Sequence, residues 1–237
     1  MARSYAIPDL HGRNDLLTAA IAAISASAAG DSLTLIALGD YVDKGPQSRQ
    51  VIEAMSALQR NPPAGWRVIC LMGNHDAMMS DAVRKPEARD FWMAQGGDIA
   101  LSSYGQRPGG EIAIPEAHIR WLEALPLMHV DRNRVFVHAG VDAEQPLDQQ
   151  TRQTLLWKRY PDEHAAGHGE RHVVHGHDRA PEGPKLLAGR TNLDTMAWST
   201  GRLVIGIFDD DQPGGPVDLI EVQGAPFGDP AARDSEG

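Results

Sequence analysis

Five apolar, strand-like runs of this sequence each end in polar residues with a glycine beside them. In open α/β sheets the ligand crevice lies outside the carboxyl ends of the strands, so five such ends predict one shared crevice. Glycine at these ends lets the backbone turn sharply and approach a ligand closely. The five segments, in chain order, are IPDLHG, LGDYVDKG, LMGNHD, VHAG and VHGH.

The side chains that would meet in this crevice are carboxylates, imidazoles and an amide, without a thiolate. Oxygen and imidazole ligands suit hard or borderline divalent cations such as manganese, iron and zinc. A lone aspartate or histidine at a strand end is more often a turn or core residue, but their joint occurrence favours a metal site. The candidates are Asp9, His11, Asp40, Asp43, Asn74, His75, Asp76, His138, His175 and His177.

Strand-like and helical runs alternate along the chain, which predicts one α/β domain. The expected strands cover residues 4–7, 33–38, 66–72, 134–140, 171–177, 202–208 and 217–222. The expected helices cover residues 16–24, 48–59, 88–95 and 115–125. Ser48 is a plausible N-cap of the second helix.

Composition limits the partners and the compartment. The 237 residues carry a formal net charge of -10 and no basic stripe, which disfavours nucleic-acid binding. A phosphorylated small molecule or a phosphoprotein is the expected partner. A single cysteine, Cys70, suits a reducing cytoplasm, and no secretory or membrane-spanning segment is expected. We therefore expect a cytoplasmic enzyme without a membrane or nucleic-acid partner.

The order of these motifs resembles that of the calcineurin-like metallophosphoesterase superfamily. Within it, the sequence is most similar to the phosphoprotein phosphatase family, especially its small bacterial and phage serine/threonine protein phosphatases. The likeness runs from about Ala6 to about Phe208, and the segments FWMAQGGDIALSSYG, LLWKR and NLDTMAW match as well.

This resemblance implies a single-domain αββα sandwich of two mixed sheets flanked by helices, with a dinuclear metal site at the strand ends. The catalytic domain would cover residues 1–223, with residues 78–124 as a helical insert beside the site and residues 224–237 as a flexible tail. The aromatic residues of the insert are expected to pack rather than to contact substrate. They are Phe91, Trp92, Tyr104 and Trp121.

The resemblance also implies two divalent ions, with manganese expected and iron, zinc or magnesium as alternatives. Asp9 and His11 would bind the first ion, and Asp40 would bridge both. The ligands of the second ion would be Asn74, His138 and His177.

By the same resemblance, a hydroxide shared by the metals would attack phosphorus in line. His75 would protonate the leaving group, with its imidazole oriented by Asp43. His175 would either support a ligand or pack in the core, and Asp76 has no definite role. The residues that would hold phosphate oxygens are Lys44, Asn74 and Arg159.

The substrate class is where the sequence departs from the family pattern. Met72 stands immediately before GNH, where protein phosphatases often have arginine, and Lys44 replaces another common arginine. Asp178 and Met196 stand where threonine and glycine are common. The main hypothesis is a phosphomonoester hydrolase acting on phosphoserine or phosphothreonine in proteins. The alternative is a hydrolase of dinucleoside polyphosphates, such as diadenosine tetraphosphate, or of small phosphate esters.

A non-catalytic binding module on this fold is disfavoured, because every implied ligand and the pair of His75 and Asp43 are present. The sequence gives no prediction of the oligomeric state or of the physiological substrate.

Overall fold

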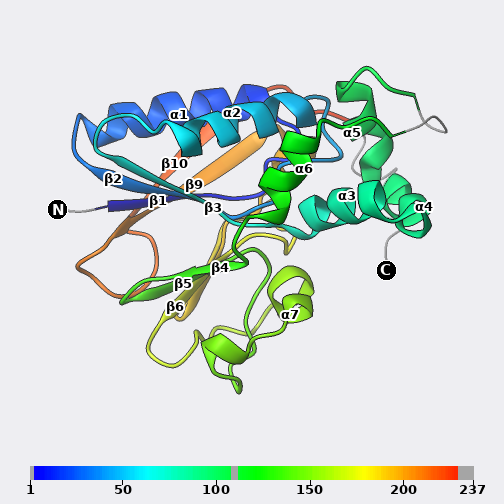
Figure 1. Ribbon diagram of the computed structural model, residues 1–237. Coiled ribbons are helices and arrows are strands. Elements are labelled where there is room, and N and C mark those ends of the chain that lie inside the picture. The colour runs from blue at the N-terminus through cyan, green and yellow to red at the C-terminus, as the bar shows by residue number, and fades with distance from the viewer. Residues whose placement is uncertain (1–2, 108–111, 229–237) are drawn as a thin grey trace.

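The computed structural model describes residues 3–107 and 112–228. Within them, two five-stranded sheets lie face to face, with α1 and α2 above the first sheet and α7 beside the second (Figure 1). This arrangement confirms the predicted αββα fold class. Most of the predicted tail, residues 229–237, lies outside the described residues.

The first sheet has the strand order β10-β9-β1-β2-β3. Its strands β1, β2 and β3 are parallel, whereas β9 and β10 are antiparallel to their neighbours. Strand bounds are Arg3–Ile7 for β1, Leu33–Ala37 for β2, Trp66–Cys70 for β3, Arg202–Asp209 for β9 and Asp218–Gln223 for β10.

The second sheet has the strand order β4-β5-β6-β8-β7 and is also mixed. Strands β5, β6 and β8 are parallel, and β4 and β7 are antiparallel edge strands. Strand bounds are Met128–Val130 for β4, Arg134–Val137 for β5, His172–His175 for β6, Lys185–Leu186 for β7 and Arg190–Asn192 for β8.

Helices connect most of the strands. The α-helices are Asn14–Ala28 (α1), Ser48–Arg60 (α2), Asn74–Arg84 (α3), Arg89–Trp92 (α4), Asp98–Ser103 (α5), Glu116–Glu123 (α6), Arg152–Trp157 (α7) and Ala197–Thr200 (α8). Residues 3–107 and 112–228 also contain two 3-10 turns, Pro86–Ala88 (η1) and Leu147–Gln149 (η3), and a π-helical turn, Met93–Gly97 (η2).

The N-cap prediction for α2 is wrong, because Gln47 precedes the first helical residue and Ser48 is already inside the helix. The hydroxyl of Ser48 accepts instead from the backbone N–H of Asp43, 3.0 Å away. Ser48 therefore helps to fix the loop that follows β2 rather than the start of the helix.

Strand alternation separates two apolar layers. Tyr5 and Ile7 of β1 face the layer under α1 and α2, while Ala6 between them faces the second sheet. The inter-sheet layer is closed from the other side by Phe136 and Val174. Because both sheets share this layer, the carboxyl ends of their parallel strands are held next to each other.

Helices α3 to α6 lie beyond one end of the first sheet (Figure 1). Helix α3, which begins at Asn74, packs against α4 and α6. The helical insert of residues 78–124 stays a prediction. Among the described residues, none of the helices is long and apolar enough to cross a membrane.

Candidate metal centre and active site

A pocket of about 250 Å³ opens between the segments that follow the parallel strands of the two sheets. The predicted convergence of the strand ends is thus present in the structure. The pocket is lined by Asp9, His11, Asp40, Lys44, Asn74, His75, Phe91, Gln95, Trp157, Arg159, His177, Arg179, Asp194 and Trp198.

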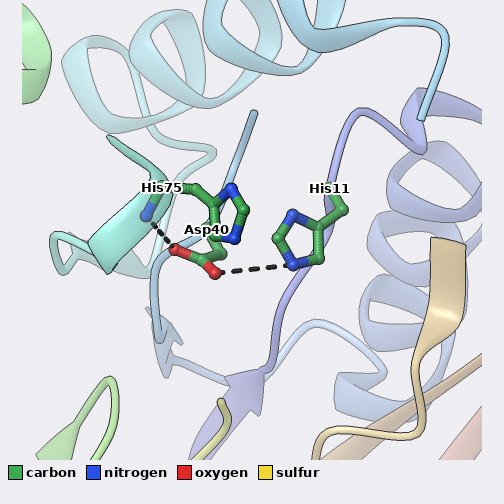
Figure 2. A group of neighbouring side chains, drawn as sticks. All are labelled: His11, Asp40 and His75. Atoms are coloured by element: carbon green, nitrogen blue, oxygen red, sulfur yellow. Dashed lines mark hydrogen bonds and ion pairs between the residues drawn. The ribbon is translucent and has the colours of Figure 1, made fainter. Parts of the chain in front are cut away.

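Asp40 lies at the centre of this cluster. Its carboxylate accepts a 2.9 Å hydrogen bond from the backbone N–H of His75 and lies 3.4 Å from Nε2 of His11 (Figure 2). Nε2 of His138 is 3.5 Å away on the other side. Two groups of possible ligand atoms share Asp40: one adds His11 and His75, and the other adds Asp9 and His138.

The loop backbone around Asp40 has a conformation that ordinary residues rarely adopt. His11, Asp40, Asp43 and Lys44 have φ angles of 41°, 54°, 70° and 62°, all in the left-handed region. Such strain persists only where the surroundings hold it, and it clusters at functional sites.

Asp76 holds part of this strained loop. Its carboxylate accepts from the backbone N–H groups of Asp40 at 2.8 Å, Gly73 at 2.9 Å and Tyr41 at 3.0 Å. Burial raises the pKa of Asp76 to about 7. Asp76, which had no definite role in the sequence, therefore fastens the loop after β2 to the start of α3.

Two glycines make room for the central carboxylates. A Cβ atom at Gly73 would collide with Oδ1 of Asp40, and one at Gly176 would collide with Oδ1 of Asp9. Neither glycine has a positive φ, so the close approach of a carboxylate, rather than a turn, requires them.

The histidines at the centre present nitrogen lone pairs to oxygen atoms. Nδ1 of His11 donates to the Val42 carbonyl, and Nδ1 of His138 donates to the Leu38 carbonyl. In a neutral ring, Nε2 is then an acceptor. Nε2 of His11 nevertheless faces the Asp40 carboxylate, and Nε2 of His138 lies 2.8 Å from Oδ1 of Asn74. Two hydrogen-bond acceptors that face each other repel. A cation bound by both would stabilise this arrangement.

The geometry of His177 gives a further indication that this cluster suits a cation. Its backbone N–H donates to both oxygens of Asp9, at 3.1 and 3.2 Å. Its Nε2 atom is buried and has no hydrogen-bond partner among the described residues. A buried nitrogen without a partner is costly, which fits a metal ligand at this position.

Burial sets the electrostatics of the cluster. Desolvation raises the pKa of the carboxyls of Asp9 and Asp40 well above their usual value. Desolvation also lowers the pKa of His177 well below its usual value, and that of His138 to about 3. The histidines are thus held in the neutral form that binds metals. The residues fit a divalent centre in donor type and geometry, and the histidines also fit in protonation.

His75 and Asp43 form the predicted pair, and a third residue supports it. Nδ1 of His75 donates to Oδ2 of Asp43 at 2.7 Å. The indole N–H of Trp92 donates to both oxygens of Asp43, at 3.0 and 3.1 Å. Gly97 leaves space for the Trp92 ring, because a Cβ there would lie 2.6 Å from it.

The structure adds detail to the expectation for two aromatic residues of the helical segment. Trp92 is buried, as expected of a packing residue, but it also bonds to Asp43. Phe91 is 55% exposed and lines the pocket, so it is available to a substrate. The neighbouring Gly96-Gly97 break was visible in the sequence, but the partner of Trp92 was not.

Three cationic side chains line the pocket: Lys44, Arg159 and Arg179. Lys44 is only 7% exposed, and its ammonium lies 5.7 Å from the centre of the Trp198 ring. Arg159 is exposed. Arg179 and the buried Asp194 were not predicted from the sequence. Burial, followed by the nearby Asp194 carboxylate, raises the pKa of Asp9. The available sequence signal was position: Arg179 follows VHGHD, and Asp194 lies within NLDT.

His175 lies behind the centre. Its Nδ1 atom donates to the carbonyl of Gly176, and its Nε2 atom accepts from Arg190 at 3.0 Å. Both ring nitrogens are thus bound within the protein. Of the two predicted alternatives, this geometry favours a supporting position next to the segment that carries His177.

The departures from the family pattern have structural partners. Met72 is buried, and its sulfur accepts a hydrogen bond from Arg152 of α7. Asp178 accepts from the backbone N–H of Tyr160. Met196 has φ 53°, a left-handed conformation in which glycine is less strained. Of these three residues, none is among those that line the pocket.

A centre of aspartate, histidine and asparagine at the strand ends of an αββα sandwich defines a metal-dependent phosphoesterase. The chain belongs to the calcineurin-like phosphoesterase family, whose family model matches residues 2–206. Membership of this family implies divalent metal ions and hydrolytic chemistry at a phosphate ester.

Curated relatives carry a more specific name. A symmetrical bis(5'-nucleosyl)-tetraphosphatase of Pseudomonas syringae pv. tomato is 29% identical over 139 residues, which are 58% of this chain and 40% of that protein. The protein of the same name from Bordetella pertussis is 28% identical over 191 residues, 69% of this chain and 61% of that protein. The matches thus span about 40 to 60% of the length of these relatives.

Solved structures show the fold but do not separate substrates. A structure whose description names a diadenosine tetraphosphatase superposes with a TM-score of 0.65 at 24% identity, covering 94% of each chain. A serine/threonine protein phosphatase from Saccharomyces cerevisiae superposes with a TM-score of 0.61 at 16% identity, covering 96% of this chain and 82% of that one. The superfamily prediction is confirmed, whereas the curated names differ from the predicted serine/threonine branch.

Proposed function

We propose that this protein is a metal-dependent hydrolase of dinucleoside polyphosphates of the diadenosine tetraphosphate kind. The observation that carries this proposal is the shared name of the curated relatives, symmetrical bis(5'-nucleosyl)-tetraphosphatase. It replaces the serine/threonine protein phosphatase as our first hypothesis.

The pocket chemistry supports a substrate with both phosphates and aromatic bases. Lys44, Arg159 and Arg179 supply positive charge beside the carboxylate and histidine cluster. Phe91 and Trp157 line the same pocket, and aromatic side chains at a pocket wall can stack on nucleobases. A phosphoserine side chain has no group that would use such a wall.

The proposed ligands are those implied by the resemblance. Asp40, which is common to both groups of ligand atoms, would be shared by two ions. Divalent ions at this site would lower the pKa of a bound water and stabilise the charge on the phosphate oxygens. Manganese is our expectation for the metal. The remaining ligands would be Asp9, His11, Asn74, His138 and His177.

The chain's own groups would orient the substrate and move a proton. Asp43 holds Nδ1 of His75, which leaves Nε2 of that ring as the atom that can carry a proton to the leaving oxygen. Lys44, Arg159 and the Asn74 amide would hold the other phosphate oxygens. A nucleoside diphosphate is a much weaker base than a serine alkoxide, so its departure depends less on protonation by His75.

The test is hydrolysis of diadenosine tetraphosphate and of a phosphoserine peptide, measured in parallel after reconstitution with manganese, magnesium or zinc. We expect kcat/KM to be at least about tenfold higher for the dinucleotide, because only that substrate can use both the cations and the aromatic wall. Liquid chromatography of nucleotides and a phosphate assay would measure the two reactions.

Metal-free protein is the control for both substrates. A tenfold preference for the peptide would restore the protein phosphatase hypothesis, which the motif order favours. A cytoplasmic location remains a prediction from the single cysteine.

A further inference from the structure

A second pocket, of about 200 Å³, adjoins the proposed active site. The two pockets share Arg159 and Arg179, which line both. The remaining residues of the second pocket are Tyr160, Asp162, Asp178, Lys185, Arg190 and Asn192. A ligand chain that leaves the metal centre past these two arginines would enter it.

The second pocket carries an excess of positive charge. Its lining residues include four cationic side chains, Arg159, Arg179, Lys185 and Arg190, and two carboxylates, Asp162 and Asp178. The active-site pocket, in contrast, combines its three cations with the carboxylates of Asp9, Asp40 and Asp194. The second pocket therefore offers charge to an anion without a metal ion.

Arg190 is the most informative of these residues. It is 1% exposed, and its hydrogen bonds go to the carbonyls of Pro161 and His164 and to Nε2 of His175. All three acceptors are neutral, and the guanidinium also lies 4.8 Å from the centre of the Tyr160 ring. Among the lining residues, the Asp178 carboxylate also acts on the charge of Arg190, without a hydrogen bond between them. Two carboxylates among four cationic side chains leave the pocket with an excess of positive charge, which favours an anionic ligand.

Lys185 lies at the rim of the pocket, on the edge strand β7. Its Nζ atom is 2.6 Å from Oδ1 of Asp162, and the Asp162 side chain is largely exposed. An ammonium has three donor hydrogens, so one bond to Asp162 leaves further donors for a phosphate oxygen. Exposed ion pairs of this kind are weak and exchange partners readily.

We infer that this second pocket is a subsite for the distal phosphate groups of a polyphosphate substrate, continuous with the metal centre through Arg159 and Arg179. The inference rests on the proposed function and makes it more specific. It assigns to the substrate a phosphate chain that extends beyond the scissile phosphate. A monoester such as a phosphoserine side chain would leave the subsite empty.

Calorimetric titration of the metal-loaded protein with inorganic tripolyphosphate and with orthophosphate tests the subsite without requiring turnover. Wild-type protein is expected to bind tripolyphosphate more tightly than orthophosphate. Lys185→Ala should weaken tripolyphosphate binding about fivefold, which is the effect expected from the loss of one partly exposed charge-assisted hydrogen bond. The same variant should leave orthophosphate binding unchanged. Lys185→Arg should keep the wild-type affinity.

Lys85→Ala is the matched control, because Lys85 is also an exposed lysine paired with one aspartate, Asp81, but lies outside both pockets. Its affinities should equal those of the wild type. In turnover, Lys185→Ala should raise KM for diadenosine tetraphosphate about fivefold with little change in kcat.

The outcomes separate the two proposals. Equal binding of tripolyphosphate by wild type and Lys185→Ala, or an equal loss for orthophosphate, would overturn the subsite. Selective loss of tripolyphosphate binding in a protein that does not hydrolyse the dinucleotide would support the subsite and refute the proposed function.

Discussion

The two sheets contribute different charges to the shared crevice. The loops that follow the first sheet supply the carboxylates of Asp9, Asp40 and Asp43, all buried. The segments around the second sheet supply three arginines, of which Arg159 is exposed and Arg179 is half-buried. His138, His177 and the buried Asp194 also follow strands of the second sheet. The difference therefore teaches that the accessible arginines, rather than the second sheet as a whole, are suited to an exchangeable anion.

The physical reason is the cost of burying charge. The negative charge of a buried carboxylate must be compensated permanently, by metal ions or by backbone N–H donors such as those that bond to Asp76. Exposed arginines remain hydrated and can bind a substrate and release it. Substitutions of the buried carboxylates should therefore change kcat and metal content, whereas substitutions of the accessible arginines should change KM.

Asp40→Asn should have the largest effect. Asparagine keeps the shape but removes the charge at the centre of both ligand groups, so activity should fall by about a thousandfold or more. Activity and bound metal, the latter by elemental analysis, would be measured together. Asp81→Asn, which changes an exposed aspartate on α3, is the control. Full activity of Asp40→Asn would refute the two-metal assignment.

Arg159→Gln should have an intermediate effect, and it should change substrate binding rather than the metal centre. We expect KM for the dinucleotide to rise about tenfold, because a charge-assisted contact to phosphate is lost, while the metal content stays that of the wild type. Steady-state kinetics with elemental analysis would measure both. A fall in metal content without a change in KM would break the proposed division between buried carboxylates and accessible arginines.

Trp92→Phe should have the smallest effect and tests whether Trp92 is a positioning residue. Losing its indole donor should lower kcat about fivefold through a less well held Asp43, with KM and metal content unchanged. Trp121→Phe is a matched control, because the Trp121 indole in α6 donates to Gln59 rather than to the site. Equal kcat in the two variants would mean that Trp92 only packs.

Several elements could be predicted from local sequence. Strands β1, β2 and β3 and the longer strand β9 stand out as apolar runs, and the structure has all four. The short edge strands β4 and β7 and the buried strand β8 were missed, since runs of two or three residues carry no period. Their pairing depends on neighbours that are distant in sequence.

The sequence by itself placed Asp9 and Asp40 at the carboxyl ends of neighbouring parallel strands, because each follows an apolar run that stops near a glycine. His177 belongs to the second sheet, so its contact with Asp9 depends on how the two sheets pack. The tertiary structure also decided which side chains support or surround this cluster. The bond from Trp92 to Asp43 spans 49 residues, and Arg190 reaches His175 from the neighbouring strand. Such contacts join side chains whose proximity follows from packing, which no local pattern specifies.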